Sequence, residues 1–520
     1  MPLLDDLLAE GYFPKELPPA FSTETFASLV VSSLQSLPAS FRNSHWVRPA
    51  SFSLAKTSGL RRRLTVANPI RFFILAELIN THWTSIQTHL ASSPLSLSKP
   101  GSDPKGTRAL VPTTQLQDLI SHRAHSRSRG KYTLVADISE FYPSLYTHTI
   151  PWAFHGKSFA KANLTNLALL GNQLDRLIRI GQEGQTIGIP IGPDTSLVIA
   201  ELVLASVDTA FAAKAIGHNG FRWMDEFEMS FTDYGSAESA LAELQHILAE
   251  FELRLNPRKT RIDEGPFGFE PRWIREIRSF QFSSSPKKFG NELARYFDLV
   301  FAHSRDNPHD HIVRYALARL RPTTIDASNW TLYQQLISHA TIHELTVVDQ
   351  YISNLLVGEQ RGFAVDAALA GSTLNYIIEQ TALLEHHHET SWALWGLLSL
   401  GEALSTKAAD RVEKSENPVV ALLALDALDQ GLVPTAFSSA PWSSHMTTAD
   451  LYGEHWLLAY EANLKGWLPS TGGADHVNSD SAFACLKNAG VEFYTPVSRP
   501  VPPPLSIVGS SLALAAAQSA

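Results

Sequence analysis

The sequence predicts an α+β protein in which a mixed α/β half is followed by an all-helical half. Two apolar runs of β-forming residues lie in the first half and carry acids, at Leu134–Asp137 and Arg222–Phe227. Helical spacing dominates from about residue 281 to 494. At 520 residues the chain is long enough for about two to four domains of roughly 100–200 residues each.

Composition divides the chain into four parts. Residues 1–130 predict mixed helix and strand, with a polar, Ser- and Pro-rich insert at 92–104. Residues 131–280 contain both acidic runs and predict an α/β layer. Residues 281–494 contain apolar segments of roughly 12–20 residues with short polar joints, which is typical of an α-repeat array or an irregular bundle. Residues 495–520 begin with a proline-rich stretch and predict an extended linker and tail.

The overall composition is that of an ordinary soluble globular protein, with 44% hydrophobic and 18% charged residues. No apolar run approaches the roughly 20 residues that a membrane helix needs. The N-terminus is acidic and lacks the basic start of a signal peptide. A single cysteine, Cys485, excludes an internal disulfide and a cysteine-based zinc site. We therefore expect a cytoplasmic protein that does not enter a membrane.

The distribution of charge matters more than its total. A net charge of −9 counts against nucleic-acid binding, because phosphate contact needs Lys and Arg. However, residues 42–73 hold seven Lys and Arg and no acid, whereas residues 401–520 hold six Lys and Arg and twelve acids. This asymmetry predicts a basic first half and an acidic helical half.

Three acids are candidate metal ligands. Asp225 and Glu226 are adjacent inside one apolar run, and Asp137 ends the other, 88 positions earlier. Burying carboxylates together is unfavourable unless a cation lies between them. Two strands that deliver these acids to one point would hold two Mg²⁺ ions, or Mn²⁺, roughly 3.5–4 Å apart, as in-line phosphoryl transfer requires. The alternative is a strand-end acid and an acid pair in a hairpin turn.

Two proline-containing turns accompany these strands. Two glycines and two prolines in Gln185–Ser196 force a turn whose backbone another molecule can approach closely, and the helix-compatible run Leu197–Val207 follows. After the second acidic run comes a predicted helix, Ser236–Phe251, and then the turn signal Asn256–Pro257. That second turn places Lys259 at the start of a new segment.

This succession resembles the palm of a reverse transcriptase. The strand that ends at Asp137 is similar to the first catalytic motif of that family, Gly188–Ser196 to its second, Trp223–Glu226 to its Tyr-x-Asp-Asp box, and Leu255–Thr260 to its fourth. The resemblance covers about residues 3 to 274. Three segments further resemble the prokaryotic abortive-infection, or defence-associated, reverse transcriptases of the unknown group: Gly11–Pro19, Tyr146–Ala153 and Gly188–Ser196.

The resemblance implies right-hand polymerase fingers at 1–130 and a palm at 131–280, which together add deoxynucleotides to a growing chain. Synthesis would be RNA-templated or template-independent, would be protein-primed on a tyrosine in some members, and would serve anti-phage defence. The implied partners are deoxynucleoside triphosphates and nucleic acid, including a structured non-coding RNA and a single-stranded DNA product. A homo-oligomer is compatible with this assignment.

The resemblance also assigns catalytic roles to particular residues. Asp137, Asp225 and Glu226, with the backbone of Ile138, would bind the metal ions. Lys259 would donate a proton to the leaving pyrophosphate, unless it is simply an exposed lysine.

The remaining roles concern the substrate. Tyr142 would exclude a ribose 2′-OH, provided that a turn after Asp137 brings it to the site; otherwise it is a core tyrosine. One of four arginines would pair with the triphosphate, unless the charge run is a solvated face: Arg61, Arg62, Arg63 or Arg71. Four residues of the first turn would shape the floor beneath the nascent base pair: Gln185, Gly188, Pro190 and Gly192.

Two residues depart from the family box. Glu226 stands where a second Asp is usual, and Trp223 stands where Tyr is usual. Glutamate keeps the charge and moves it outward by about one methylene, so we expect an active enzyme with altered geometry. A second hypothesis is a catalytically weak palm that serves as a nucleic-acid-binding scaffold. A third, an RNA-dependent RNA polymerase, is disfavoured by the aromatic Tyr142.

Overall fold

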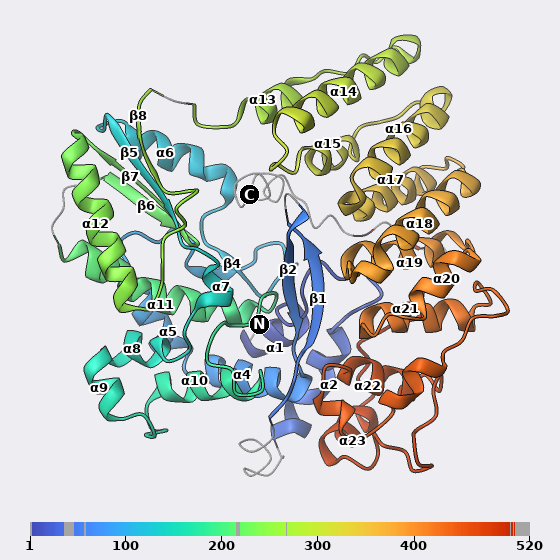
Figure 1. Ribbon diagram of the computed structural model, residues 1–520, viewed down its shortest axis with the longest axis horizontal. Coiled ribbons are helices and arrows are strands. Elements are labelled where there is room, and N and C mark those ends of the chain that lie inside the picture. Colours follow the sequence, from blue (N-terminus) through green and yellow to red (C-terminus); the bar gives the residue numbers. More distant parts are fainter. Residues whose placement is uncertain are drawn as a thin grey trace.

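A computed structural model of the protein describes residues 3–35, 46–56, 59–214, 219–266, 268–499, 501–502 and 504. Within these residues the protein is a mixed α/β molecule, about 55% helical, with three small antiparallel sheets (Figure 1). All of these strands precede α13 (Arg272–Ser279), and the regular elements described from there on are helices. The mixed α/β class that the sequence predicts is confirmed at this level.

The largest sheet lies in the first half. Its four antiparallel strands run in the order β6 (Asn219–Trp223), β7 (Glu226–Phe231), β5 (Tyr132–Asp137) and β8 (Arg261–Glu264). Three helices accompany it: α6 (Leu119–Arg127), α11 (Asp194–Ala212) and α12 (Tyr234–Glu250).

Helices cover both faces of this sheet. On β7, Glu228 accepts hydrogen bonds from Arg123 and Arg127 of α6. On β6, Arg222 pairs with Glu201 of α11. Arg222 lies opposite Phe227, so these two side chains share a face of the sheet. Glu228, the next residue of β7, points to the other face, because neighbouring residues of a strand alternate. Helix α6 therefore lies on one face and α11 on the other, so both strands that carry the acids are enclosed.

The other elements of the first half are short. Two hairpins are formed by β1 (Ala50–Ala55) with β2 (Arg61–Val66), and by β3 (Pro100–Ser102) with β4 (Leu110–Pro112). The helices are α1 (Leu3–Ala9), α2 (Glu24–Gln35), α4 (Pro69–Thr81), α5 (Trp83–Ala91), α7 (Phe141–Ser144), α8 (Thr149–His155), α9 (Lys157–Ala162) and α10 (Leu170–Ile180).

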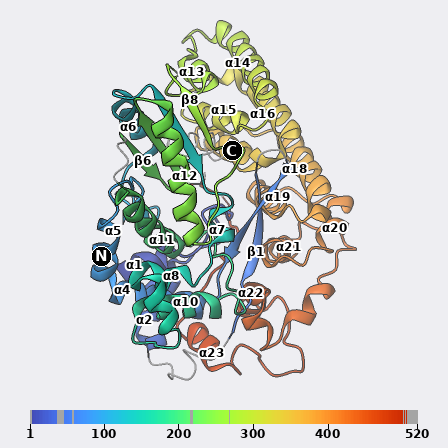
Figure 2. The same cartoon turned by 60° about the vertical axis from the view of Figure 1, so that its left-hand side comes forward.

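The helices of the second half form two rows. They are α13 (Arg272–Ser279), α14 (Pro286–Asp306), α15 (Ile312–Leu320), α16 (Trp330–His343), α17 (Val348–Gln360), α18 (Ala367–Thr381), α19 (His387–Leu400), α20 (Thr406–Val412), α21 (Pro418–Asp429), α22 (Trp456–Leu464) and α23 (Ser481–Asn488). Helices two apart in sequence pack side by side. Accordingly, α14, α16, α18 and α20 make one row, and α15, α17, α19 and α21 make the other (Figures 1 and 2).

The two halves share one hydrophobic core. Helix α19 packs on β1, and α23 packs on α2. The indole of Trp456 donates a hydrogen bond to the Val66 carbonyl at 3.1 Å, and the indole of Trp392 donates to the Glu16 carbonyl at 2.8 Å. Figure 2 shows β1 lying between the first-half helices and the row that contains α19 and α21. The helical half therefore supports the β1–β2 hairpin directly.

Residues 92–104 are predicted to be a polar insert, but the first half of this segment packs against the sheet and is partly buried. Leu97 N donates to the Arg222 carbonyl, and Arg222 N donates to the Leu95 carbonyl, each at 2.8 Å, so the segment lies along β6. Ser93 and Ser98 are buried, with their hydroxyls bound to carboxylates of α11. Composition alone could not show this, because a serine hydroxyl suits water and a buried carboxylate equally.

The residues after α23 are extended and packed where they are described. Thr495 N donates to the Ala20 carbonyl at 2.8 Å, and Val497 N donates to the Asp426 carboxylate at 2.9 Å. The predicted tail lies outside the described residues from 505 to 520.

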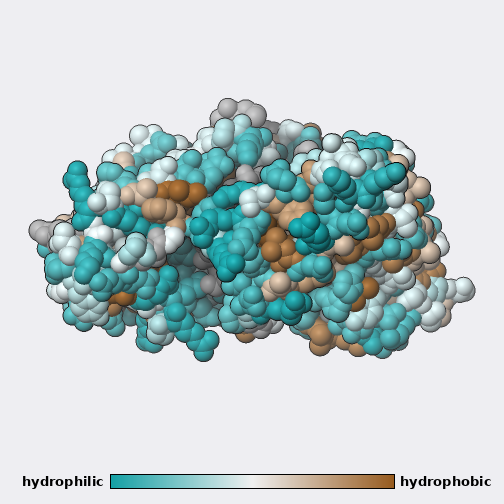
Figure 3. Space-filling model, turned by 90° about the horizontal axis from the view of Figure 1, so that it is seen from above, coloured by the Kyte–Doolittle hydropathy of each residue, from teal (hydrophilic) through white to brown (hydrophobic). Residues whose placement is uncertain are grey.

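One helix in the described chain, α11, is long and apolar enough to span a membrane, but 78% of its apolar window is buried inside the protein. Burial of this kind is that of a core helix. The face of the molecule seen in Figure 3 is mostly hydrophilic, and apolar residues form separate patches on it.

Candidate functional site

The three predicted metal-ligating acids lie together at one end of the large sheet. Asp137, the last residue of β5, lies directly opposite Glu226, the first residue of β7, so their side chains share a face. Met224 and Asp225 form the two-residue turn between β6 and β7. The N–H of Ile138 donates to the Asp225 carbonyl at 3.1 Å, which fixes this turn against the end of β5.

The site carries more negative charge than its surroundings neutralise. Burial raises the pKa of Asp225 to about 6, and repulsion from Asp137 adds to the shift. Burial also raises the pKa of Glu226 to about 8, followed by repulsion from Asp225 and then from Asp137. Lys259 lowers both pKa values without cancelling these effects. A bound cation would favour the charged form of every carboxylate in the cluster.

The turn at Asn256–Pro257 forms as predicted and brings Lys259 to Asp137. Lys259 Nζ lies 3.4 Å from Asp137 Oδ2. Asn256 is bound to the same residue twice, because its backbone N–H donates to the Asp137 carbonyl at 2.7 Å and its side-chain amide donates to Oδ1 at 3.2 Å. Asp137 is therefore held from the side of β8, while Asp225 approaches it from the side of β7.

The acids fit hard divalent cations but do not form a complete cage. Among the residues that the structure describes, no group of three or more His, Cys, Asp or Glu side chains is close enough to hold an ion by itself. Mg²⁺ is commonly bound by one or two carboxylates, with water and substrate phosphates completing its shell. The Ile138 carbonyl accepts no backbone hydrogen bond from any described residue, which leaves it available as an oxygen ligand.

Tyr142 reaches the same site because a turn follows Asp137. Glu140 has a left-handed backbone with φ of 46°, and the short helix α7 begins at the next residue. The phenol is partly buried: burial raises the pKa of Tyr142, and the neighbouring Asp225 carboxylate adds to the shift. Simple strand alternation would have turned this side chain away, so the turn decides its place.

The glycine-rich turn lies against the Tyr142 segment. Ile189 N donates to the Tyr142 carbonyl and Gly188 N to the Leu145 carbonyl, each at 2.9 Å. Gly188 has φ of 87°, and a Cβ there would lie 3.0 Å from the Pro143 carbonyl oxygen. A residue with a side chain would therefore be strained and crowded at this position.

The far end of the same turn meets β2 and the N-terminal segment. After Pro190, the Ile191 carbonyl accepts a hydrogen bond from Thr65 N of β2 at 2.8 Å. Gly192 has φ of 127°, and a Cβ there would lie 2.6 Å from the ring of Pro14. Gln185, at the start of the turn, is exposed. The turn therefore connects the Tyr142 segment to the strand that carries the arginine run.

Among the four candidate arginines, the structure favours Arg62. The Arg62 guanidinium lowers the pKa of Asp225 and of Tyr142, against the larger raising effect of burial, and so lies within electrostatic reach of both. Its neighbour Arg61 faces the helical half, where its guanidinium pairs with Glu389 at 2.6 Å.

The other two arginines do not face the acids. Arg63 lies two residues from Arg61 on the same strand face, is exposed, and acts electrostatically on His387 of α19. Arg71 of α4 is only 4% exposed, and burial lowers its pKa to about 10. Arg71 therefore lies inside the protein rather than at the site.

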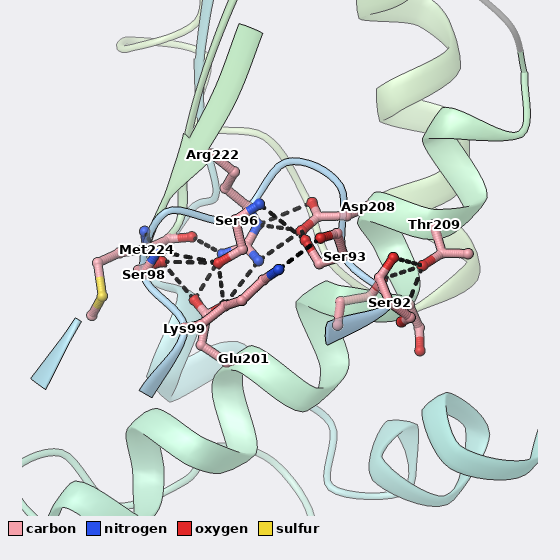
Figure 4. A network of polar contacts seen from close by, with 12 residues as sticks. Ser92, Ser93, Ser96, Ser98, Lys99, Glu201, Asp208, Thr209, Arg222 and Met224 are labelled. Atoms are coloured by element: carbon pink, nitrogen blue, oxygen red, sulfur yellow. Dashed lines mark hydrogen bonds and ion pairs between the residues drawn. The ribbon is translucent and has the colours of Figure 1, made fainter. Parts of the chain in front are cut away.

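A buried polar network next to the turn was not predicted. Arg222 is fully buried and pairs with Glu201 and Asp208, both from α11 (Figure 4). Burial alone would lower the pKa of Arg222, but the Asp208 and Glu201 carboxylates overcome that effect and raise it. The sequence carries a signal for this network, because the two acids lie seven positions apart, on one face of an otherwise apolar helix.

No protein-family model matches the sequence of this protein, and no curated protein matches it.

Proposed function

We propose that the protein is a reverse transcriptase-like nucleotidyltransferase that adds deoxynucleotides to a growing chain by metal-assisted phosphoryl transfer. One observation carries this proposal: Asp137, Asp225 and Lys259, from three separate motifs, meet Tyr142 at the end of one sheet. The alternative is that the acids at the strand end and in the hairpin turn have no shared function. That alternative does not explain why partly buried carboxylates, an aromatic ring and a lysine lie together at one point.

Each residue has a role that follows from its place. Asp137, Asp225 and Glu226 would bind two Mg²⁺ ions, which lower the pKa of the attacking hydroxyl and neutralise charge on the phosphates. Arg62 would pair with the triphosphate, since a guanidinium binds phosphate oxygens through parallel hydrogen bonds. Lys259, held beside Asp137, would donate a proton to the departing pyrophosphate.

The substrate class follows from the aromatic side chain. Tyr142 would lie under the sugar of the incoming nucleotide and leave no room for a 2′-OH, which selects deoxynucleotides. The resemblance to defence-associated reverse transcriptases supports a role in anti-phage defence, with RNA-templated or template-independent synthesis that can be protein-primed. The expected partners are nucleic acid and further copies of the chain.

A nucleotide-incorporation assay tests the proposal. Purified protein is incubated with Mg²⁺ and each labelled dNTP or rNTP, alone or with RNA and DNA oligonucleotides. We expect dNTP incorporation that Asp137→Asn abolishes, whereas Asp263→Asn, which removes a surface carboxylate of β8, leaves it unchanged. Absence of product with every nucleotide would support the scaffold alternative, and a preference for rNTPs would support an RNA polymerase.

A further inference from the structure

The turn that carries Asp225 contains a strained residue. Met224, the residue before Asp225, has φ of 54°, a left-handed conformation that is unfavourable for a residue with a Cβ atom. Such a backbone persists only where surrounding contacts impose it, and strain of this kind is concentrated at functional sites. The direction of the Asp225 side chain depends on this conformation, because the two residues form one tight turn.

Both backbone groups of Met224 are bound by side chains. Its N–H donates to Ser98 Oγ at 2.7 Å, and its carbonyl accepts from Arg222 Nη1 at 2.6 Å. The same two side chains are joined through Glu201, which accepts from Ser98 Oγ at 2.8 Å and from both terminal nitrogens of Arg222. Figure 4 shows the three side chains meeting beside the turn.

Ser98, Glu201 and Arg222, which we call the clamp, form a rigid network because they are buried away from water. Ser98 and Arg222 are 0% exposed and Glu201 is 1% exposed, so water cannot substitute for a lost hydrogen bond. The Asp208 carboxylate also accepts hydrogen bonds from Arg222, so two carboxylates hold the guanidinium in place. A fully satisfied network of this kind specifies one arrangement of its members.

We propose that Ser98, Glu201 and Arg222 are positioning residues that impose the left-handed conformation of Met224 and so direct the Asp225 carboxylate toward Asp137. This inference rests on the proposed function, because it explains how the metal-binding acids are set. All three clamp residues are buried and therefore lie out of reach of a substrate. Loss of the Ser98 hydroxyl leaves no buried charge unpaired, so it should weaken divalent-cation binding at the acids more than it disturbs the fold.

The test is Ser98→Ala, with Ser93→Ala as its matched control. Both remove a buried serine hydroxyl that donates to a carboxylate of α11, but Ser93 bonds to Asp208 and does not contact Met224. Mn²⁺ binding is titrated by electron paramagnetic resonance, and folding is checked by circular dichroism. We expect about tenfold weaker Mn²⁺ binding in Ser98→Ala and a change of less than about twofold in Ser93→Ala. Equal binding in Ser98→Ala and wild type, or an equal loss in both variants, would overturn the proposal.

A rescue experiment separates positioning from general stability. Glycine adopts a positive φ readily, so Met224→Gly removes the need for the clamp. We expect the double variant Ser98→Ala/Met224→Gly to regain Mn²⁺ affinity to within about threefold of wild type, although the added glycine lowers thermal stability further. Failure of this rescue in a folded double variant would contradict the positioning role. Should Ser98→Ala not fold, Ser98→Cys keeps the side-chain volume with a much weaker donor and acceptor.

A further variant distinguishes failure of this inference from failure of the proposed function. If Asp225→Asn does not lower Mn²⁺ affinity, the acids are not a metal site, and the proposed function and the clamp fall together. If Asp225→Asn lowers the affinity and Ser98→Ala does not, the metal site stands and only the positioning role is wrong.

Discussion

At the scale of single residues, burial and repulsion raise the pKa values of two carboxylates at the site, whereas Lys259 and Asn256 fix the position of Asp137. Burial raises the pKa of Asp225 to about 6 and that of Glu226 to about 8, and repulsion adds to both shifts, from Asp137 at Asp225 and from Asp225 and Asp137 at Glu226. Lys259 and Asn256 instead hold Asp137 in place through direct contacts. Such a cluster would bind protons near neutral pH in the absence of a cation, and a bound cation would displace them.

The first prediction concerns stability and pH. Because the folded pKa of Asp225 lies above its value of 3.8 for the unfolded chain, the folded state holds extra protons, and stability falls as pH rises from about 4 through about 6. Asp225→Asn removes this penalty, so the metal-free variant should be more stable than wild type at pH 8 by on the order of 2 kcal/mol, and equally stable near pH 4. Chemical denaturation at both pH values measures the difference, and Mg²⁺ should stabilise wild type alone at pH 8. A variant less stable at pH 8 would contradict the prediction.

The second prediction concerns sugar selection. Tyr142 lies beside Asp225, so its removal should admit a ribose 2′-OH and lower the ratio of kcat/KM for dNTP over rNTP by about tenfold or more. Tyr142→Phe keeps the ring and should keep the selectivity. Steady-state kinetics with matched dNTP and rNTP measures both variants. Unchanged selectivity in Tyr142→Ala would remove this residue from the sugar gate.

At the scale of secondary-structure elements, the two faces of strand β2 have different roles. Alternation places Arg62 and Arg61 on opposite faces of β2. Arg62 lies within electrostatic reach of Asp225, whereas Arg61 pairs with the buried Glu389 of α19. The run of three arginines in the sequence therefore combines a candidate substrate contact with an anchor to the helical half. Sequence alone could not separate these roles, since strand register and the partner helix set them.

The third prediction follows from the two sides of β2. Arg62→Ala should raise KM for dNTP by about tenfold or more with little change in thermal stability, because the Arg62 side chain is only half-buried and pairs with no buried acid among the described residues. Arg61→Ala should leave an unpaired buried carboxylate at Glu389 and destabilise the protein by about 3 kcal/mol, with little effect on KM. Kinetics and denaturant unfolding of the two variants measure the contrast. Similar effects of both substitutions on KM would contradict it.

The predicted elements show where sequence patterns succeed and where they fail. The helix predicted at Ser236–Phe251 forms as α12, and the run Leu197–Val207 lies inside α11. In the second half, helical apolar spacing runs from Tyr333 to Leu356 and by itself indicates one helix, but the structure divides this stretch between α16 and α17, with a 3-10 turn at Leu345–Val347. Hydrophobic periodicity continues across this break because both helices bury one face in the same core.

At the scale of the whole molecule, the two halves are not independent in structure. The core is continuous, and Trp392 and Trp456 each donate a hydrogen bond to backbone of the first half. The helical half therefore supports the β1–β2 hairpin, which contains Arg62. A boundary near residue 280, expected from composition, marks a change of secondary structure rather than a gap between cores.

The fourth prediction tests this dependence. A fragment of residues 1–280 should not unfold cooperatively, because β1 and α2 would lose the apolar surfaces of α19 and α23 that cover them. In the full chain, Trp456→Ala should cost about 3–5 kcal/mol through the same interface. Thermal unfolding followed by near-ultraviolet circular dichroism measures both. A sharp transition in the fragment would show that the first half folds by itself.

The sequence by itself determined the α+β class, the acidic strands, the two turns and the identity of the candidate metal-binding acids, because these depend on local residue patterns. Only the tertiary structure decided which arginine lies within reach of the acids, that Tyr142 reaches them, and that Ser98 of a seemingly polar segment binds the turn at Met224. The physical reason is that these features depend on contacts between residues far apart in the chain. Strand register, a left-handed turn and a buried ion pair set those contacts, and none of them leaves a periodic trace in the sequence.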